Sequence, residues 1–246
     1  MNFVEIKTIA QEAIKLSATR TELWLYILNS LKVQSVLEAG VFKGVFAQDI
    51  LNGTPSIKNY IFVDPWRNLA CWNKPANKSD EEFDTIRSEA LLRTAEHKSK
   101  IKELRMTTKE ASYYIDDDCL DFAYIDGDHT LRGITIDLTL LLPKIRKGSI
   151  IGGDDFKKNI WQHGEKFDPT EVFPFALYFA EANNLKIITL PFDQFLIHKS
   201  EGFELVDFAN YRDLTPTEIY SFPKSERRKL NMVGFLRRLL DVFKNY

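Results

Sequence analysis

The sequence predicts an α/β fold: a doubly wound, mostly parallel sheet of seven strands with one antiparallel edge strand and helical additions at both ends. Short apolar runs alternate with segments of helical periodicity from residue 35 onward, which is typical of parallel strands joined by helical crossovers. The last two apolar runs are joined by too few residues for a crossover, so we expect an antiparallel hairpin there. The first two runs each end on an acidic residue, and a glycine loop follows the first.

The bulk composition limits the function classes. The 246 residues, 44% of them hydrophobic and 13% aromatic, suffice for one large domain with a substantial core. A formal net charge of −2 provides no overall attraction for nucleic acid or an anionic membrane, so neither is expected as a partner. Two cysteines and no long uncharged run argue against a disulfide framework, a signal peptide or a membrane span. We therefore expect a soluble cytoplasmic protein, with a homo-oligomer left open.

The chain divides into three parts. Residues 1–33 predict a helical cap of two amphipathic helices, and residues 34–200 contain the alternating strands and helices. Strands are expected at 35–39, 60–64, 101–106, 120–126, 149–153, 186–190 and 194–198, and helices at 43–52, 80–97, 108–115, 129–145 and 170–183. The helix at 129–145 has the clearest periodicity, and Lys147-Gly148 is expected to mark its end. Residues 65–80, rich in asparagine and proline, predict a long ordered loop or lid.

Residues 201–246 predict a C-terminal extension. Its last part, 224–244, has apolar residues on one helical face and arginines and lysines elsewhere, as in a basic amphipathic helix. Such a helix could lie on an anionic membrane, pack into a partner subunit or dock on its own domain. We favour docking or a subunit contact over a membrane role.

The loop after the first strand has the spacing Glu38-x-Gly40-x-x-x-Gly44, and the second strand stops on Asp64. This departs from the dinucleotide fingerprint, because Lys43 and Val45 crowd the position where a pyrophosphate would sit. The loop instead suits a ligand without phosphates, whose amino-acid end needs a carboxylate and bare backbone amides. It resembles the first motif of the class I S-adenosylmethionine-dependent methyltransferases, which have a Rossmann-like sheet.

That resemblance implies roles for the residues of the loop. Asp64 would bind the two ribose hydroxyls of S-adenosylmethionine, because a carboxylate can accept from both. Glu38 and the backbone of Gly40 would contact the methionine part, and Gly44 would allow a helix to approach closely. The simpler alternative is that a strand, a turn and a helix with two glycines form only a tight turn.

Residues after the third and fourth strands complete the expected cofactor site. Thr107 or Thr108 would lie near the adenine, and Asp126 is a further expected cofactor contact. Asp126 also belongs to a second motif, Ile125-Asp126-Gly127-Asp128-His129, and the next strand ends in Gly152-Gly153-Asp154-Asp155. Because neighbouring parallel strands end at the same edge of a sheet, Asp126 should face Asp154 and Asp155.

Three carboxylates that converge with no lysine or arginine between them would repel one another, and the pKa of each would rise unless a cation lay among them. Mg²⁺, which prefers oxygen ligands, is the cation we expect. Over about residues 34–200 the two motifs resemble the metal-dependent O-methyltransferases akin to macrocin O-methyltransferase and the cephalosporin hydroxylase group. The resemblance implies that Asp126, Asp154 and Asp155 are metal ligands and that Asp126 or His129 is the catalytic base.

The implied reaction is methyl transfer to a hydroxyl of a small molecule, such as a sugar or a glycosylated metabolite. Metal coordination would lower the pKa of that hydroxyl, and the base would take its proton. Two alternatives are kept: a metal-dependent oxygenase like cephalosporin hydroxylase, and a non-catalytic binding or assembly protein that retains the fold.

Other residues near these motifs have competing interpretations. Asp128 is best explained as an ordinary helix N-cap. The loop histidine, His163, could contact substrate but is more simply a surface or structural residue. Trp66, Trp72 and Trp161 could form a wall over the substrate or could merely anchor their loops.

Overall fold

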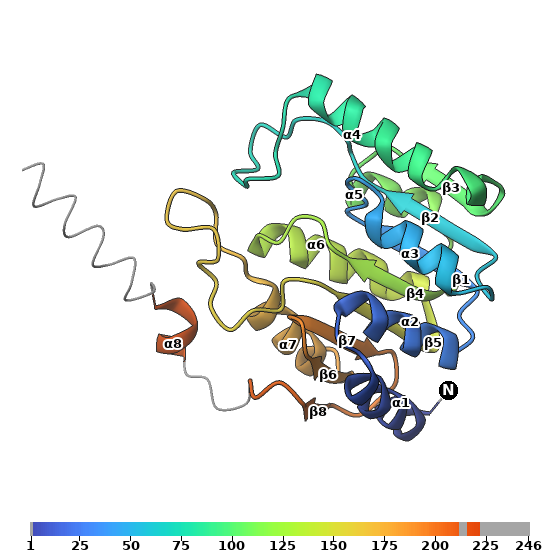
Figure 1. Cartoon of the computed structure of the whole chain (residues 1–246). Helices are drawn as coiled ribbons and strands as arrows, with labels where there is room; N and C mark the ends of the chain where they lie inside the picture. Colours follow the sequence, from blue (N-terminus) through green and yellow to red (C-terminus); the bar gives the residue numbers. More distant parts are fainter. Residues whose placement is uncertain (1, 212–215, 222–246) are drawn as a thin grey trace, which may run out of the picture.

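The computed structural model describes residues 2–211 and 216–221, which form one sheet with helices on both faces (Figure 1). The strands are β1 (Ser35–Ala39), β2 (Asn59–Val63), β3 (Ile101–Leu104), β4 (Leu120–Ile125), β5 (Ile145–Gly153), β6 (Lys186–Leu190), β7 (Gln194–His198) and β8 (Glu204–Asp207). The α-helices are α1 (Phe3–Leu16), α2 (Arg20–Ser30), α3 (Val45–Gly53), α4 (Asp80–Arg93), α5 (Thr108–Ala111), α6 (Leu131–Leu141), α7 (Val172–Ala182) and α8 (Pro216–Tyr220).

The strand order is β3-β2-β1-β4-β5-β7-β6-β8. Only β7 runs against its neighbours; it pairs antiparallel with β5 on one side and with β6 on the other, whereas the other pairs of this sheet are parallel. The predicted doubly wound, mostly parallel sheet with one antiparallel strand is confirmed, although that strand, expected at the edge, lies between β5 and β6. An eighth strand, β8, extends the sheet beyond β6 and comes from the range predicted as the C-terminal extension.

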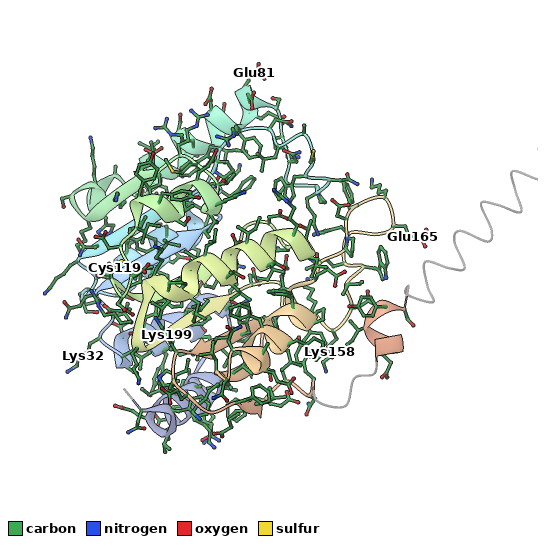
Figure 2. The ribbon with its side chains drawn as sticks, turned by 180° about the vertical axis from the view of Figure 1, so that it is seen from behind. Lys32, Glu81, Cys119, Lys158, Glu165 and Lys199 are labelled. Atoms are coloured by element: carbon green, nitrogen blue, oxygen red, sulfur yellow. The ribbon has the colours of Figure 1, made fainter. Side chains whose placement is uncertain are left out.

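Each face of the sheet has its own hydrophobic core. Successive side chains of a strand point to opposite faces. Phe122 and Tyr124 of β4 therefore pack under α1, α2, α3 and α4, whereas Ala123 and Ile125 pack under α5, α6 and α7. Seen from behind, α6 and α7 run across the second face (Figure 2).

Trp24 of α2 is one of the buried side chains that hold the N-terminal helices on the first face. Trp24 is fully buried, with its ring centroid 5.0 Å from that of Phe122 and 5.7 Å from that of Tyr124. It lies over Gly152 of β5, where an added Cβ would come 2.1 Å from the indole ring. The Trp24 Nε1 also donates to Oε1 of Gln194, 2.8 Å away. The glycine thus creates the space that lets α2 sit on the middle of the sheet.

Two predicted boundaries of the helix at 129–145 are wrong. The helix ends at Leu141, and β5 already begins at Ile145. The cause is Pro143, which has no amide hydrogen to continue the α-helical bonds, so the chain passes into a short 3₁₀ segment over Leu142–Lys144. The N-cap of this helix is Thr130, whose hydroxyl accepts from the Gly133 amide at 3.1 Å. The expected N-cap, Asp128, instead accepts from the Thr130 amide.

Two further predicted helices compare differently with the structure. The predicted helix at 80–97 ends at Arg93, where a short 3₁₀ segment follows. The basic amphipathic helix predicted at 224–244 lies outside the described residues. Within residues 2–211 and 216–221, no helix has the length and apolar character needed to span a bilayer.

Candidate functional site

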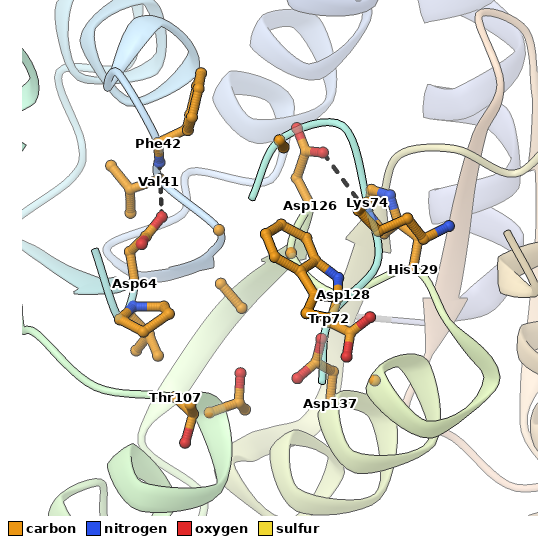
Figure 3. Close-up of a pocket in the computed structure, with 18 of the residues that line it drawn as sticks. Val41, Phe42, Asp64, Trp72, Lys74, Thr107, Asp126, Asp128, His129 and Asp137 are labelled. Atoms are coloured by element: carbon orange, nitrogen blue, oxygen red, sulfur yellow. Dashed lines mark hydrogen bonds and ion pairs between the residues drawn. The ribbon is translucent and has the colours of Figure 1, made fainter. Parts of the chain in front are cut away.

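A cavity of about 690 Å³ opens at the carboxyl ends of β1, β2 and β4 (Figure 3). Backbone hydrogen bonds extend the ladder one residue past each strand: Gly40 N donates to Val63 O, Asp126 N to Ala39 O and Asp154 N to Ile125 O. These bonds place the residues that follow β1, β4 and β5 along one edge of the sheet. The predicted convergence of the acids at this edge is therefore what the structure shows.

Asp64 lies directly after β2, where it lines the cavity and is 7% exposed. One carboxylate oxygen accepts from the backbone amide of Phe42 at 2.8 Å (Figure 3). The other accepts from the backbone amide of Trp66, also at 2.8 Å. Burial raises the pKa of Asp64, and the two amide bonds partly offset this. Each oxygen retains a lone pair, so the carboxylate can still accept from two hydroxyl groups of a ligand.

Glu38, near the end of β1, is an almost fully buried acid whose hydrogen-bond donor, Tyr60, is uncharged. It is 1% exposed and accepts a hydrogen bond of 2.6 Å from the hydroxyl of Tyr60. Burial holds the pKa of Glu38 well above its usual range, although the Tyr60 bond acts in the opposite direction. Because Glu38 also lines the cavity, a cationic group bound there would stabilise its ionised form.

The two glycines of the first loop serve different contacts. Gly40 has a φ of +93°, and an added Cβ would lie 2.1 Å from the carbonyl oxygen of Asp126. Gly40 lines the cavity, so only a bare backbone fits between β1 and the loop after β4. Gly44 has a φ of +70° as the N-cap of α3, and its added Cβ would lie 3.1 Å from Ala90 of α4. Gly44 therefore lies at a close helix approach and outside the cavity lining.

Thr107 and Thr108 line another wall of the cavity, with a buried acid behind them. Thr107 is the N-cap of α5 and forms a capping box with Glu110. Thr108 is hydrogen-bonded to the carboxyl group of Asp137 on α6. Asp137 is 4% exposed, and burial, assisted by the charge of Asp128, raises its pKa to about 7. The sequence analysis did not single out Asp137, because it looks like one more polar residue of an amphipathic helix.

The acids after β4 and β5 share a cationic partner from α2. Arg20 is in direct contact with Asp154, and its Nη1 lies 3.5 Å from Oδ2 of Asp126. The other oxygen of Asp154 accepts from Nε2 of Gln194 at 2.6 Å. The expectation that no lysine or arginine lies among these acids is thus wrong, because Arg20 comes from a distant part of the chain.

His129 and Asp155 form a dyad next to this ion pair. The Nδ1 of His129 lies 2.6 Å from Oδ2 of Asp155, and its Nε2 faces Asp126 at 3.7 Å (Figure 3). Burial alone lowers the pKa of His129, but the hydrogen bond and charge of Asp155 outweigh it and the net shift is upward. His129 is 8% exposed, and its Nε2 has no hydrogen-bond partner within the described part of the chain.

The electrostatics of the two remaining acids differ. Burial raises the pKa of Asp126 to about 6, and Asp155 adds to the shift, while His129 and Arg20 oppose it. For Asp155 the balance is reversed: burial acts upward, but the bonds from His129 and Gln162 hold its pKa well below the usual range. Asp155 is therefore a carboxylate that orients His129, so that a neutral imidazole presents Nε2 as a proton acceptor.

These residues do not fit Mg²⁺ as they stand. An octahedral Mg²⁺ needs oxygen lone pairs directed at one point about 2.0–2.1 Å away. Here the guanidinium of Arg20 contacts Asp154 and lies 3.5 Å from Oδ2 of Asp126, and the imidazole of His129 is paired with Oδ2 of Asp155. Among the residues that the structure describes, no group of three His, Cys, Asp or Glu side chains is arranged to hold a metal ion.

Two loops cover the cavity and are fastened to each other. Lys74, in the loop of residues 64–79, is 6% exposed and donates to the carbonyl oxygens of Asp168 and Pro169 and to the hydroxyl of Thr170. The Nδ2 of Asn73 donates to the carbonyl oxygen of Lys166. The loop expected at 65–80 is therefore ordered and is linked to the segment that precedes α7.

The three tryptophans of the expected wall separate into two kinds. Trp72 lines the cavity, and its buried Nε1 has no partner among residues 2–211 and 216–221. Trp66 is fully buried and donates to the carbonyl oxygen of Phe42, and Trp161 donates to that of Tyr220. Trp66 and Trp161 lie outside the cavity lining and anchor their loops, so for these two the second of the two alternatives holds. His163 does line the cavity.

Comparison with known proteins agrees with this architecture. Residues 37–156 match a family model described as a methyltransferase domain. Among curated proteins, none matches the chain significantly.

Solved structures share the fold at low sequence identity. An O-methyltransferase from Bacillus cereus in complex with SAH has 14% identity and a TM-score of 0.52, covering 80% of this chain and 91% of its own. The O-methyltransferase TomG from Streptomyces achromogenes, in complex with SAM, has 14% identity and a TM-score of 0.51, covering 82% and 92%. An SAH-bound methyltransferase from Podospora anserina has 15% identity and a TM-score of 0.52, covering 80% and 85%.

Proposed function

We propose that the chain transfers a methyl group from S-adenosylmethionine to a hydroxyl of a small molecule. The match of residues 37–156 to a model of a methyltransferase domain supports this. One observation carries the proposal: a single cavity is lined by Glu38 and Asp64 at one side and by His129 at the other. A binding site for the methyl donor and a base for the acceptor therefore share one chamber.

The residues at the β1 and β2 ends fit the methyl donor. Asp64 is a buried carboxylate with lone pairs left for the two ribose hydroxyls. Glu38 is a buried acid to which the ammonium group of the methionine part would supply a positive charge. Gly40 leaves a passage that any side chain would close. Thr107 and Thr108 line the wall that we assign to the adenine.

S-adenosylmethionine would supply an electrophilic methyl group, whose bond to sulfur breaks with its electron pair as the bond to the acceptor oxygen forms. His129 is placed to accept the hydroxyl proton at Nε2, because Asp155 holds Nδ1 as the protonated nitrogen. The linked loops held by Lys74 would limit the orientations of the acceptor in the chamber.

Oxygen as the acceptor atom is supported by the solved relatives, of which those from Bacillus cereus and Streptomyces achromogenes are named O-methyltransferases. A sugar or glycosylated metabolite remains the acceptor class that we propose. Support for it comes from the ring of Trp72 and from its unpaired indole nitrogen, which can donate to a hydroxyl group.

The test begins with binding, by isothermal titration of the full chain with S-adenosylhomocysteine. Asp64→Asn should weaken binding roughly 100-fold, because a hydrogen bond to a charged group contributes about 1.5–3 kcal/mol. Asp49→Asn, which changes a carboxyl group outside the cavity, is the matched control and should bind like the parent. Thermal unfolding of both variants without ligand establishes that they are folded.

An Asp64→Asn variant that binds as tightly as the parent would overturn the ribose assignment. Transfer is then followed with radiolabelled S-adenosylmethionine and a panel of hydroxyl compounds that includes free and glycosylated sugars. Binding of the cofactor without labelling of any acceptor in a broad panel would favour the non-catalytic alternative.

A further inference from the structure

The three acids at the expected cation position already have cationic or amide groups beside them. Arg20 contacts Asp154 and lies 3.5 Å from Oδ2 of Asp126. Asp154 Oδ1 accepts from Gln194 at 2.6 Å, and Asp155 Oδ2 accepts from His129 and from Gln162, the latter at 2.9 Å. Arg20 thus lies between two acids from adjacent strands, as a bridging metal ion would.

The packing of α2 against the sheet fixes the backbone of Arg20 close to the two acids. Arg20 is the first residue of α2, and Thr19 caps that helix by accepting from the Glu22 amide. Trp24, four residues later and therefore on the same side of the helix, is fully buried and bonded to Gln194. Gln194 in turn donates to Asp154, so one chain of bonds fixes both the helix and the acid.

Charge argues against a second cation at this position. Asp126 and Asp154 carry at most two negative charges, and the guanidinium of Arg20 is permanently protonated. A divalent ion placed between the same two acids would have to displace Arg20 or lie beside its positive charge. The Arg20 side chain is 40% exposed and lines the cavity, so it still has N–H groups that can point to a ligand.

We propose that Arg20 takes the place of the divalent cation: it bridges Asp126 and Asp154, directs an N–H group at the acceptor oxygen, and makes turnover independent of metal. This rests on the proposed methyltransferase function. In the reaction, the guanidinium stabilises the acceptor oxygen as its proton passes to Nε2 of His129, and Arg20 itself neither gains nor loses a proton. Arg20 is therefore a catalytic residue at the acceptor oxygen, and it also positions the two acids.

The first arm of the test needs no substrate. Thermal unfolding of the full chain is measured with EDTA, with millimolar Mg²⁺ and with millimolar Mn²⁺, for the wild type, Arg20→Ala and Arg67→Ala. Arg67 lines the same cavity but pairs with Glu110, so its removal leaves the three acids as they are. We expect no shift in Tm with either metal for the wild type and Arg67→Ala, and a metal-dependent rise for Arg20→Ala. Adding Asp154→Ala to Arg20→Ala should abolish that rise.

The second arm measures methyl transfer. Wild-type turnover should be unchanged by EDTA. Arg20→Ala should lower kcat about 100-fold, as when one stabilising donor is removed, and Arg20→Lys should retain part of the kcat that Arg20→Ala loses. Binding of S-adenosylhomocysteine should change little in either variant.

Two results would overturn the proposal. One is a wild type that Mg²⁺ stabilises and EDTA inactivates, since the metal would then displace Arg20. The other is an Arg20→Ala variant that is folded and gains no metal-dependent stabilisation. If Arg20→Ala does not fold, the proposal is tested by the metal dependence of the wild-type Tm and turnover and by the kcat of Arg20→Lys. Failure of the methyltransferase assignment would appear separately, as absence of S-adenosylhomocysteine binding in the wild type.

Discussion

Replacing Asp137 by asparagine should stabilise the protein above neutral pH. Asp137 is 4% exposed, and burial raises its pKa to about 7 from an ordinary value of 3.8. The pKa lies about three pH units above that ordinary value, and each unit corresponds to about 1.36 kcal/mol, so ionising Asp137 in the folded state costs about 4 kcal/mol. Asparagine has nearly the same shape and cannot ionise, so it avoids this cost while keeping an oxygen for the Thr108 hydrogen bond.

The sign of the pH dependence follows from proton binding. Between about pH 4 and pH 7 the folded protein holds a proton on Asp137 that the unfolded chain has lost, so the contribution of Asp137 to stability falls as the pH rises through that window. The advantage of Asp137→Asn should therefore grow by roughly 2–3 kcal/mol between pH 5 and pH 8.

Urea unfolding followed by tryptophan fluorescence, without ligand, measures this difference at both pH values. Thr108→Val, which removes the bond that lowers the pKa of Asp137, is the control and should steepen the wild-type pH dependence. Asp137→Asn profiles that run parallel to the wild type across pH 5–8, or that lie below it at pH 8, would refute the reasoning.

Three further perturbations test other parts of the site. Gly40→Ala should lower the free energy of unfolding by about 1–3 kcal/mol or more, because its Cβ would lie 2.1 Å from the Asp126 carbonyl oxygen and φ is +93°. Chemical denaturation measures this free energy, and an unchanged midpoint would contradict the close approach. Lys74→Met removes three hydrogen bonds between the two loops and should speed limited proteolysis within residues 64–79 and 157–171. An unchanged rate of cleavage would show that other contacts hold the loops together. His129→Gln should reduce kcat about 100-fold or more while leaving cofactor affinity nearly unchanged; equal loss of both would indicate a structural role.

The elements at the sheet edge were predictable because each depends on local sequence. The apolar runs that end in Glu38, Asp64 and Asp126 are short and bounded by turn residues, and parallel strands joined by crossovers must end at one edge. The same reasoning placed β6 and β7 in a hairpin, since their connection is too short for anything else. Where local reasoning was wrong, as at the end of α6, the signal was present in Pro143 and was outweighed by the apolar periodicity.

Local sequence patterns were enough to predict the fold class, most of the strands and helices and the set of acids at the carboxyl edge. The partners of those acids depend on the three-dimensional fold: Arg20 lies beside Asp126 and Asp154, and Tyr60 donates to Glu38. The same holds for Lys74, which links the two covering loops. The physical reason is that a side chain's charge state and hydrogen bonds depend on burial and on neighbours far away in the chain. No local pattern encodes which distant cation reaches a given carboxylate.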